Sequence, residues 1–198
     1  PARCISCWDE FRMEEWMVLE KYLIEHCAPT LASLKTASLM SLPWGEEMEH
    51  QILRYNEELS GKGVEILVLR PEGNRALVYV YRKKMLEEDL KQSRVRRILC
   101  QYGYKTNGVQ EVLEGLANRL SLQRDFPHEI GLFLGYPPGD VEGFIQNCGR
   151  NCKCSGCWKV YCDEYEARRT FARYAKCRRI YGRLWREGRS IRQLTVVS

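Results

Sequence analysis

The sequence predicts an α+β fold, in which a small antiparallel sheet packs against several helices. Two β-rich runs, 64–69 and 76–81, flank the turn residues 71–74 and are typical of a β-hairpin. The segments before and after this hairpin repeat apolar residues at helical spacing. No long Pro-, Ser- or Gly-rich linker divides the chain, so we expect residues 1–198 to form a single domain.

Three helices are expected before the hairpin. The first should end near Cys27, because Pro29 disfavours helical backbone at the residue before it. A second helix, capped by Thr30, is expected to continue through Met40. After the Pro-Trp-Gly sequence at 43–45, a third helix presents one apolar face made of Met48, Ile52, Tyr55 and Leu59.

Helices are expected after the hairpin at about 84–100 and 109–121. The apolar run 130–134 fits either a helix or a strand. Pro138 can occupy the first turn of a further helix. Residues 157–161 then predict a further strand, which we expect to pack with the hairpin in the small sheet.

A basic helix is expected over residues 163–187, beginning at a capping box formed by Asp163 and Glu166. Residues 150–198 contain 13 Lys and Arg against 4 Asp and Glu, whereas residues 1–149 contain 18 against 22. This asymmetry predicts either packing of the basic helix on the acidic body or contact with a nucleic acid or another acidic partner. The cations considered for such a contact are Arg168, Arg169, Arg173, Lys176, Arg179, Arg183 and Arg186.

The composition is that of an ordinary globular protein, with 44% apolar and 29% charged residues. No apolar run reaches the roughly 18 residues of a membrane-spanning helix. Residues 1–16 include acidic side chains where a signal peptide needs an apolar run, so a cytoplasmic location is expected. The ten cysteines, several of them in the loop 148–157, are then expected to be free thiols, buried cysteines or metal ligands rather than a disulfide scaffold.

His26 and Cys27 form the first candidate site, with Lys35 downstream. A thiolate is favoured at the N-terminal end of a helix, so Cys27 could act as a nucleophile or ligand if it faces the helix that begins near Thr30. The alternative is a buried cysteine at a helix–proline–helix corner.

His128 and Glu129 form the second candidate site. An imidazole and a carboxylate perform acid–base chemistry near neutral pH, or bind a metal. Because neighbouring residues on a strand face opposite sides, one of the two could instead pair with a basic residue of the C-terminal helix.

The predicted strand at 158–161 supplies the third candidate site. Trp158 and Val160 share one face, while Lys159 and Tyr161 share the other. The ammonium and phenol of the second face could hold an anionic ligand, or simply form an amphipathic outer face. Trp158 completes this candidate ligand-binding set.

Four cysteines form a candidate metal site for zinc or iron. Cys154 and Cys157 have the spacing of a zinc or iron–sulfur knuckle. Cys148 and Cys152 could complete a local site, and the Cys-x2-Cys pair at positions 4 and 7 is the alternative second pair.

Several common enzyme motifs are missing from the sequence. It contains no Walker loop, no G-x-G-x-x-G after a strand and no G-x-S-x-G. Nucleotide hydrolysis, Rossmann dehydrogenation and serine hydrolase chemistry are therefore not expected.

Four blocks of the chain form a recognisable pattern: HCAPTLASLKTASL at 26–39, FPHEIGLFLGYPPGDVEGFI at 126–145, GCWKVY at 156–161, and A-x3-F-x2-Y-x2-C from Ala167 to Cys177. They resemble a bacterial family called domain of unknown function 3793, and the likeness extends over roughly residues 10–195. The resemblance implies an occurrence mostly in anaerobic Gram-positive bacteria. The family has no agreed activity, so the resemblance implies no catalytic residues.

The leading expectation is a small-ligand-binding or thiol-redox protein. Its site would join residues of several segments: His26, Cys27, Lys35, His128, Glu129, Lys159 and Tyr161. Cys27 would be nucleophile or ligand, a histidine would carry the proton, and the two lysines would bind an anion. The alternatives are a metal-binding protein and a nucleic-acid or acidic-partner binder; the sequence does not decide whether the protein is an enzyme.

Overall fold

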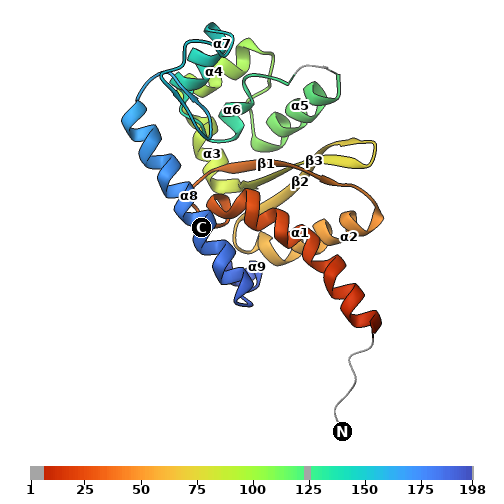
Figure 1. The fold of residues 1–198 in the computed structure, drawn as a ribbon. Helices are drawn as coiled ribbons and strands as arrows, with labels where there is room; N and C mark the ends of the chain where they lie inside the picture. Colours follow the sequence, from red (N-terminus) through yellow and green to blue (C-terminus); the bar gives the residue numbers. More distant parts are fainter. Residues whose placement is uncertain (1–6, 123–125, 198) are drawn as a thin grey trace.

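A three-stranded antiparallel sheet lies at the centre of the computed structural model, which describes residues 7–122 and 126–197 and, from Val18 onward, their side chains. Its strands are β1 (Ala37–Pro43), β2 (Val64–Glu72) and β3 (Arg75–Arg82), in the order β1-β3-β2. Helices cover both faces of the sheet (Figure 1), which confirms the α+β class.

Two layers of helices enclose the sheet (Figure 1). One face is covered by α1 (Cys7–Leu31), α2 (Glu46–Ser60) and α9 (Ile191–Leu194). The other face is covered by α3 (Lys83–Lys91), α4 (Ser93–Gln101), α5 (Val109–Leu122), α6 (Ile130–Phe133) and α7 (Pro138–Gln146). The long helix α8 (Glu164–Arg186) runs along the side of both layers, and its C-terminal half packs on α1.

The central strand β3 is buried on both of its faces. Tyr79 and Tyr81 pack against the layer of α3 to α7, while Val78 and Val80 pack against the layer of α1 and α2. The Tyr79 hydroxyl donates a hydrogen bond of 2.5 Å to the Phe133 carbonyl. The alternating sequence of β3 therefore supports two apolar cores, and one of its side chains also holds α6 on the sheet.

The N-terminal third differs from the prediction at two points. Helix α1 does not end near Cys27 but continues through Pro29 to Leu31. Pro29 lies in the last turn, so only Thr30 and Leu31 follow it in the helix, and the disturbance from its ring and its missing N–H stays at the helix end. The helix predicted over 30–40 is wrong, since residues 37–43 form β1 and pair along their whole length with β3. This pairing, which buries alternate residues of β1, outweighs the local helical pattern.

Two further segments are arranged differently from the expectation. The helix expected at about 84–100 is divided into α3 and α4 by Gln92, whose backbone is extended. Residues 157–161 do not join the central sheet; β5 (Lys159–Val160) instead pairs with β4 (Cys154–Ser155) in a separate two-stranded ribbon. The undecided run 130–134 contains the short helix α6.

The local signals of the remaining elements are confirmed. Helix α2 buries the four apolar residues expected on its inner face, and α7 has Pro138 in its first turn. The Asp163 carboxylate accepts a hydrogen bond of 3.0 Å from the Glu166 amide and caps α8, whereas the Glu166 carboxylate pairs with Arg169, so only half of the predicted capping box is formed. Ser190 and Gln193 form a capping box at the start of α9.

Arg82 is a fully buried cation at the end of β3. Its guanidinium donates hydrogen bonds to the carbonyl oxygens of Thr30 (2.5 Å) and Leu31 (2.6 Å) at the end of α1. It also donates to the carbonyl of Val196 (2.9 Å) and, at 3.4 Å, to that of Lys62. One side chain therefore joins the end of α1, the turn after α2 and the segment that follows α9.

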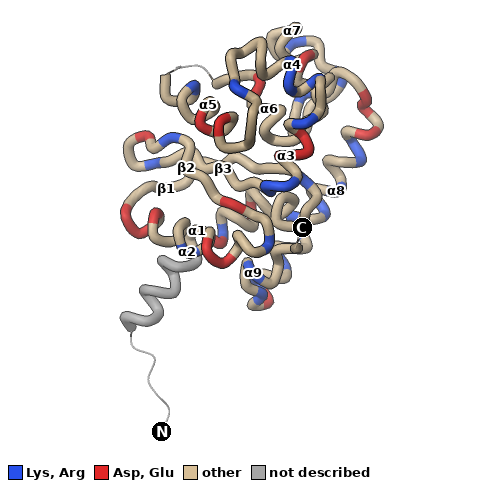
Figure 2. Tube along the Cα trace, turned by 180° about the vertical axis from the view of Figure 1, so that it is seen from behind, with Lys and Arg blue, Asp and Glu red and all other residues tan. Residues whose placement is uncertain are grey.

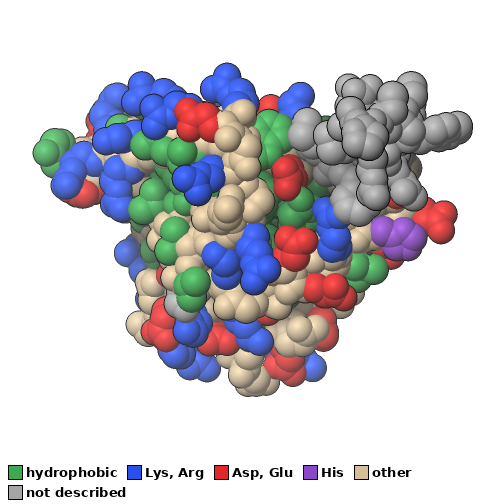
Figure 3. Space-filling view, turned by 90° about the horizontal axis from the view of Figure 1, so that it is seen from below, with side chains coloured by type: hydrophobic (Ala, Val, Ile, Leu, Met, Phe, Trp, Pro, Cys, Tyr) green, Lys and Arg blue, Asp and Glu red, His purple; other side chains and the backbone are tan. Residues whose placement is uncertain are grey.

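Charge is distributed unevenly over the fold. Acidic residues are frequent on α2, whereas basic residues are frequent on α8 (Figure 2). In the view from below, Lys and Arg side chains gather on the side formed by α8 and α9 (Figure 3). In the part of the chain that the structure describes, no helix is long and apolar enough to span a membrane.

Candidate functional site

One cavity, which we call the aromatic pocket, has a volume of about 610 Å³ and lies between α6, α7 and the β4–β5 ribbon. Its walls are mostly apolar and aromatic, with a few polar groups. The aromatic residues that line it are Phe126, Tyr136, Phe144 and Trp158, and the polar ones are His128, Asp140, Ser155 and Lys159.

Asp140, on α7, fixes the ribbon that closes the aromatic pocket. Its buried carboxylate accepts hydrogen bonds of 2.8 Å from the backbone amides of Tyr161 and Cys162. The indole N–H of Trp158 donates a third hydrogen bond of 2.8 Å to the same carboxylate. The position of Trp158 is therefore set by a buried acceptor rather than by the two short strands alone.

Two basic side chains lie at the rim of the aromatic pocket. The exposed His128 ring meets the Phe144 ring edge-on, with the ring centroids 5.2 Å apart. Lys159 Nζ donates a hydrogen bond of 2.7 Å to the Gly149 carbonyl and lies 5.8 Å from the centre of the Phe144 ring. Both groups could contact a polar substituent on a ligand in the pocket.

A second cavity, the basic pocket, has a volume of about 500 Å³ and lies between the end of α1, the segment leading into β1, and α8. His26, Lys35 and Arg178 supply its basic side chains, and no Asp or Glu lines it. Lys35 Nζ lies 5.2 Å from the centre of the Tyr136 ring. Burial lowers the pKa of Lys35, and this effect is partly opposed by nearby Cys27 and Cys157.

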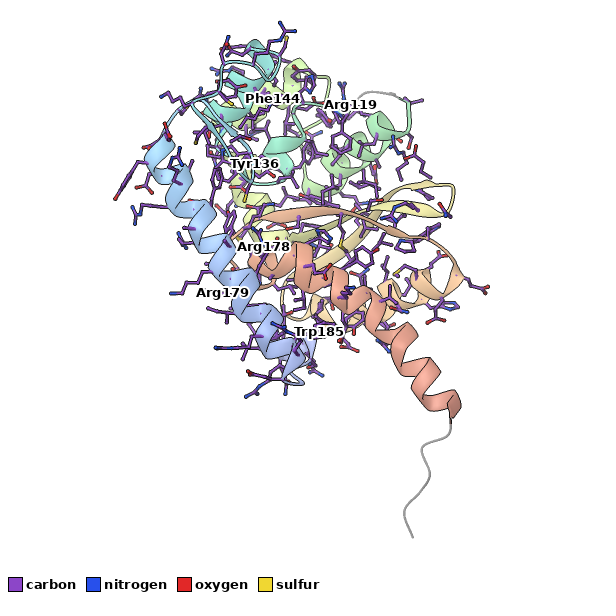
Figure 4. All side chains as sticks on the ribbon, viewed as in Figure 1. Arg119, Tyr136, Phe144, Arg178, Arg179 and Trp185 are labelled. Atoms are coloured by element: carbon purple, nitrogen blue, oxygen red, sulfur yellow. The ribbon has the colours of Figure 1, made fainter. Side chains whose placement is uncertain are left out.

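The two pockets adjoin, because Tyr136 and Gly156 line both. The Trp158 ring stacks on Tyr136 at 4.9 Å and meets Phe171 edge-on at 4.6 Å. Gly156 is required where it lies, since a Cβ atom there would be 2.4 Å from the Phe171 ring. In Figure 4, Tyr136 lies between Phe144 of the aromatic pocket and Arg178 of the basic pocket.

The turn before α7 brings Tyr136 to this junction. Gly135 has a φ of +71°, a conformation that favours glycine, and it approaches Thr36 so closely that a Cβ would lie 2.5 Å from the Thr36 hydroxyl. That hydroxyl donates a hydrogen bond of 2.5 Å to Asp89 on α3. Tyr136 is therefore held between the residues leading into β1 and the β4–β5 ribbon, where its own hydroxyl donates to the Cys157 carbonyl.

The first predicted pair, His26 and Cys27, is divided between surface and core. The His26 ring is exposed, stacks on Tyr22 at 5.9 Å and lines the basic pocket. Cys27 has no exposed surface and contacts Met40, with the sulfur atoms 3.8 Å apart. Burial raises the pKa of Cys27 to about 12 despite the nearby Lys35 ammonium. The thiol therefore has neither the charge nor the access that a nucleophile needs.

Alkylation of the folded protein should leave Cys27 unmodified while the exposed Cys100 and Cys148 react. The reason is that alkylation requires an accessible thiolate. Iodoacetamide labelling over time, followed by peptide mass spectrometry, measures each site separately. Labelling in urea is the control that should expose Cys27, and native labelling of Cys27 as fast as that of Cys148 would contradict this expectation.

The second predicted pair is divided in the same way. His128 lines the aromatic pocket, whereas Glu129 is buried and lies 2.9 Å from Arg119 Nε on α5. The Tyr104 hydroxyl donates a hydrogen bond of 2.9 Å to the same Glu129 carboxylate. Glu129 therefore stabilises the packing of α5, and its ion-pair partner comes from α5 rather than from the C-terminal helix.

The remaining predicted residues lie in several places. Trp158 and Lys159 line the aromatic pocket, while the Tyr161 hydroxyl donates to the Arg150 carbonyl at 2.9 Å. Cys157 lines the basic pocket. Among residues whose side chains the structure describes, no three His, Cys, Asp or Glu side chains converge as metal ligands, and this set includes Cys148, Cys152, Cys154 and Cys157. The cysteines at positions 4 and 7 lie outside the described side chains.

The outer face of α8 is basic but partly neutralised. Three of its arginines form ion pairs within or next to the helix: Arg168 with Glu164, Arg169 with Glu166, and Arg183 with Glu187. These are exposed pairs, of the kind that contribute little to stability.

Sequence reasoning missed several residues of the two pockets, among them Tyr136, Asp140 and Arg178. Arg178 follows the buried Tyr174 by four residues, so helical spacing places it near the inner face of α8. This spacing could be read from the sequence, but it did not distinguish Arg178 from the many exposed cations of the same helix. The roles of Tyr136 and Asp140 depend on contacts with residues 157–162, which only the tertiary structure brings near them.

Comparison with known proteins identifies the family but not the activity. A family model described as "Protein of unknown function (DUF3793)" matches residues 23–195. No curated protein and no solved structure matches the chain. The match includes both pockets and nearly the whole described fold. The chain therefore belongs to the DUF3793 family of proteins of unknown function.

Proposed function

We propose that this protein binds a small organic ligand in the aromatic pocket. The observation that carries the proposal is a cavity of about 610 Å³, mostly apolar, whose walls include four aromatic rings and a few polar groups. Cavities of this size and character are typical of small-molecule sites. Its position between α7 and the β4–β5 ribbon is held by the buried Asp140 carboxylate.

The walls favour a ligand with a flat apolar body. Aromatic rings gain free energy by stacking on or meeting other rings edge-on, in addition to the apolar area they bury. Phe144 and Trp158 present such surfaces, and His128 and Lys159 lie where a polar substituent would reach the rim. Phe126 is 44% exposed, so part of this aromatic wall also faces solvent.

The other functions considered from the sequence have less support from the geometry. The Cys27 side chain is completely buried, so it is not accessible for thiol-redox chemistry. A metal site has no converging group of three ligands among the described side chains. Contact with a polyanion would use an outer face of α8 on which three arginines already form ion pairs. The eight cysteines whose side chains the structure describes are all free, which fits the reducing cytoplasm, where we propose that ligand binding takes place.

The neutral fluorophore N-phenyl-1-naphthylamine should bind to the protein with increased fluorescence. Substitution of Phe144→Ala should weaken this binding about 10-fold, because it removes one aromatic wall. Ser155→Trp should abolish it, because Ser155 is an exposed pocket residue and its replacement would fill the cavity. Titrations followed by fluorescence give the dissociation constants.

Tyr165→Ala is the matched control for these variants. Tyr165 is an aromatic residue on α8 that is 71% exposed and lines neither pocket. Its substitution should leave the affinity unchanged, and thermal melting should show that all variants fold. No binding to the folded native protein, or equal losses in Phe144→Ala and Tyr165→Ala, would refute the proposed function.

A further inference from the structure

The basic pocket contains positive charge that no carboxylate neutralises. Lys35 and Arg178 line it together with His26, and no Asp or Glu is among the lining residues. In the described part of the chain, neither Lys35 nor Arg178 forms an ion pair with a carboxylate. Tyr136 and Tyr174 add no negative charge, because burial raises the pKa of each to about 12.

This arrangement is costly for the folded protein in the absence of an anion. Removing an ammonium from water is unfavourable unless a partner compensates it. The contact of Lys35 with the Tyr136 ring, at 5.2 Å, offsets only part of that cost. Burial lowers the pKa of Lys35, and this lowering reflects the same uncompensated cost of removing the ammonium from water. An anion bound between Lys35 and Arg178 would compensate this positive charge and remove the cost.

The position of the basic pocket relates it to the aromatic pocket. Tyr136 and Gly156 line both cavities, which therefore adjoin, and the Phe171 ring of the basic pocket packs closely against Gly156. Trp158, which lines the aromatic pocket, stacks on Tyr136 and also meets the ring of Phe171, which lines the basic pocket. A single ligand with an apolar body and an acidic group could therefore contact both cavities at this junction.

We propose that the basic pocket binds the acidic group of an organic anion, a phosphate, sulfonate or carboxylate, whose apolar body occupies the aromatic pocket. The part of this inference that concerns the apolar body rests on the proposed function. The anion site itself rests only on Lys35, Arg178 and His26. Arg178 offers a planar guanidinium that suits an oxyanion, and Lys35 offers a compact ammonium.

Two fluorescent probes that differ by one sulfonate group test this inference. They are the anionic 8-anilinonaphthalene-1-sulfonate and the neutral N-phenyl-1-naphthylamine. Lys35→Met should weaken binding of the anionic probe about 10- to 100-fold, since it removes a charged hydrogen-bond donor, and should change binding of the neutral probe less than about 2-fold. Arg178→Met should have the same selective effect. Inorganic phosphate should compete with the anionic probe only.

Lys176→Met is the matched control, because Lys176 is an exposed lysine on α8 that does not line either pocket. Its substitution should change neither affinity. Lys35→Met should melt at the same temperature as the native protein or higher, because it removes a partly buried charge that no carboxylate compensates. A melting temperature at or above that of the native protein therefore shows that Lys35→Met has lost binding and not folding.

The possible results distinguish the two proposals. If the neutral probe binds but Lys35→Met and Arg178→Met leave the anionic probe unaffected, the anion site is refuted and the proposed function stands. If neither probe binds but calorimetry shows phosphate binding that Lys35→Met abolishes, the aromatic site is refuted and the anion site stands. If phosphate alone binds with no dependence on Lys35, the anion site is refuted, since the ion then binds elsewhere.

The affinity for the anionic probe should also fall as the pH rises toward 10.5, the ordinary pKa of lysine. Burial lowers the pKa of Lys35, so its charge is lost below that value. The other groups that face Lys35 are His26 and Cys27 on α1, Tyr136, Cys157, and Tyr174 and Arg178 on α8. Cys27, Tyr136 and Tyr174 remain neutral over most of this range, with pKa values of about 12. In Lys35→Met, the affinity for the anionic probe should fall less steeply with rising pH. The same pH dependence in Lys35→Met and in the native protein would contradict a role of the Lys35 charge in binding.

Discussion

Replacing Arg82 with methionine is expected to lower the free energy of unfolding by about 3–5 kcal/mol. The substitution removes a charged donor from the carbonyl groups of Thr30, Leu31 and Val196. The Thr30 and Leu31 carbonyls each keep a backbone donor, from Ser33 and Val196, so the expected loss is that of hydrogen bonds from a charged group, each worth about 1.5–3 kcal/mol. Urea denaturation, followed by circular dichroism and by tryptophan fluorescence, measures the change.

Two comparison variants test the cause of this loss. Arg82→Lys keeps the positive charge but cannot reach separate carbonyl groups with a planar fork, so we expect it to recover only part of the stability. Arg75→Met is the matched control on the same strand, because Arg75 is exposed and bonds only Ser41. A loss for Arg82→Met no larger than that for Arg75→Met would show that the buried hydrogen bonds contribute little.

Replacing Asp140 with alanine should lower the free energy of unfolding by about 3–4 kcal/mol and should also abolish binding in the aromatic pocket. Three donors lose their acceptor: the amides of Tyr161 and Cys162 and the indole of Trp158. Two of them hold the end of the β4–β5 ribbon, so the ribbon should detach from α7. Hydrogen exchange of residues 154–162 would report the detachment separately from global unfolding, which denaturation measures.

Asp140→Asn separates hydrogen bonding from charge. Its amide oxygen can accept from the two backbone amides, but its NH2 group would then face the Trp158 N–H donor, so we expect an intermediate loss. Glu142→Gln, two residues further along α7, is the control: Glu142 pairs with Arg94 and Arg97 on the surface, and its loss should cost less than about 1 kcal/mol. Equal exchange rates at residues 154–162 in Asp140→Ala and native protein would exclude the proposed role of Asp140.

Elements with local signals could be predicted from the sequence. The hairpin of β2 and β3, the apolar face of α2 and the Asp163 cap of α8 each depend on residues close together in the chain. Strand β1 could not be predicted in this way, because its conformation depends on pairing with β3, about forty residues away. The small ribbon was placed in the wrong sheet for the same reason, since Asp140 on α7 determines where it packs.

The candidate site was predictable only in part. The family blocks contain pocket residues that were predicted as site residues, among them His26 and Lys35 in the block at 26–39 and His128 in the block at 126–145. Within each adjacent pair, however, His26 and His128 face a cavity, whereas Cys27 and Glu129 face the interior. Adjacent side chains point in different directions, so a pattern of neighbouring reactive residues does not show which of them reaches the ligand.

The hydrogen bond between Arg82 and Val196 has a consequence for synthesis on the ribosome. The two residues are 114 positions apart, and the segment that carries Val196 also bonds Leu31 and Lys62 through backbone groups. Until α9 and Val196 have left the ribosome, Arg82 lacks one of its acceptors and the apolar face under α1 and α2 lacks Ile191 and Leu194. The nascent chain must therefore carry an incomplete core until Val196 has left the ribosome, and chaperones would have access to that face during this time.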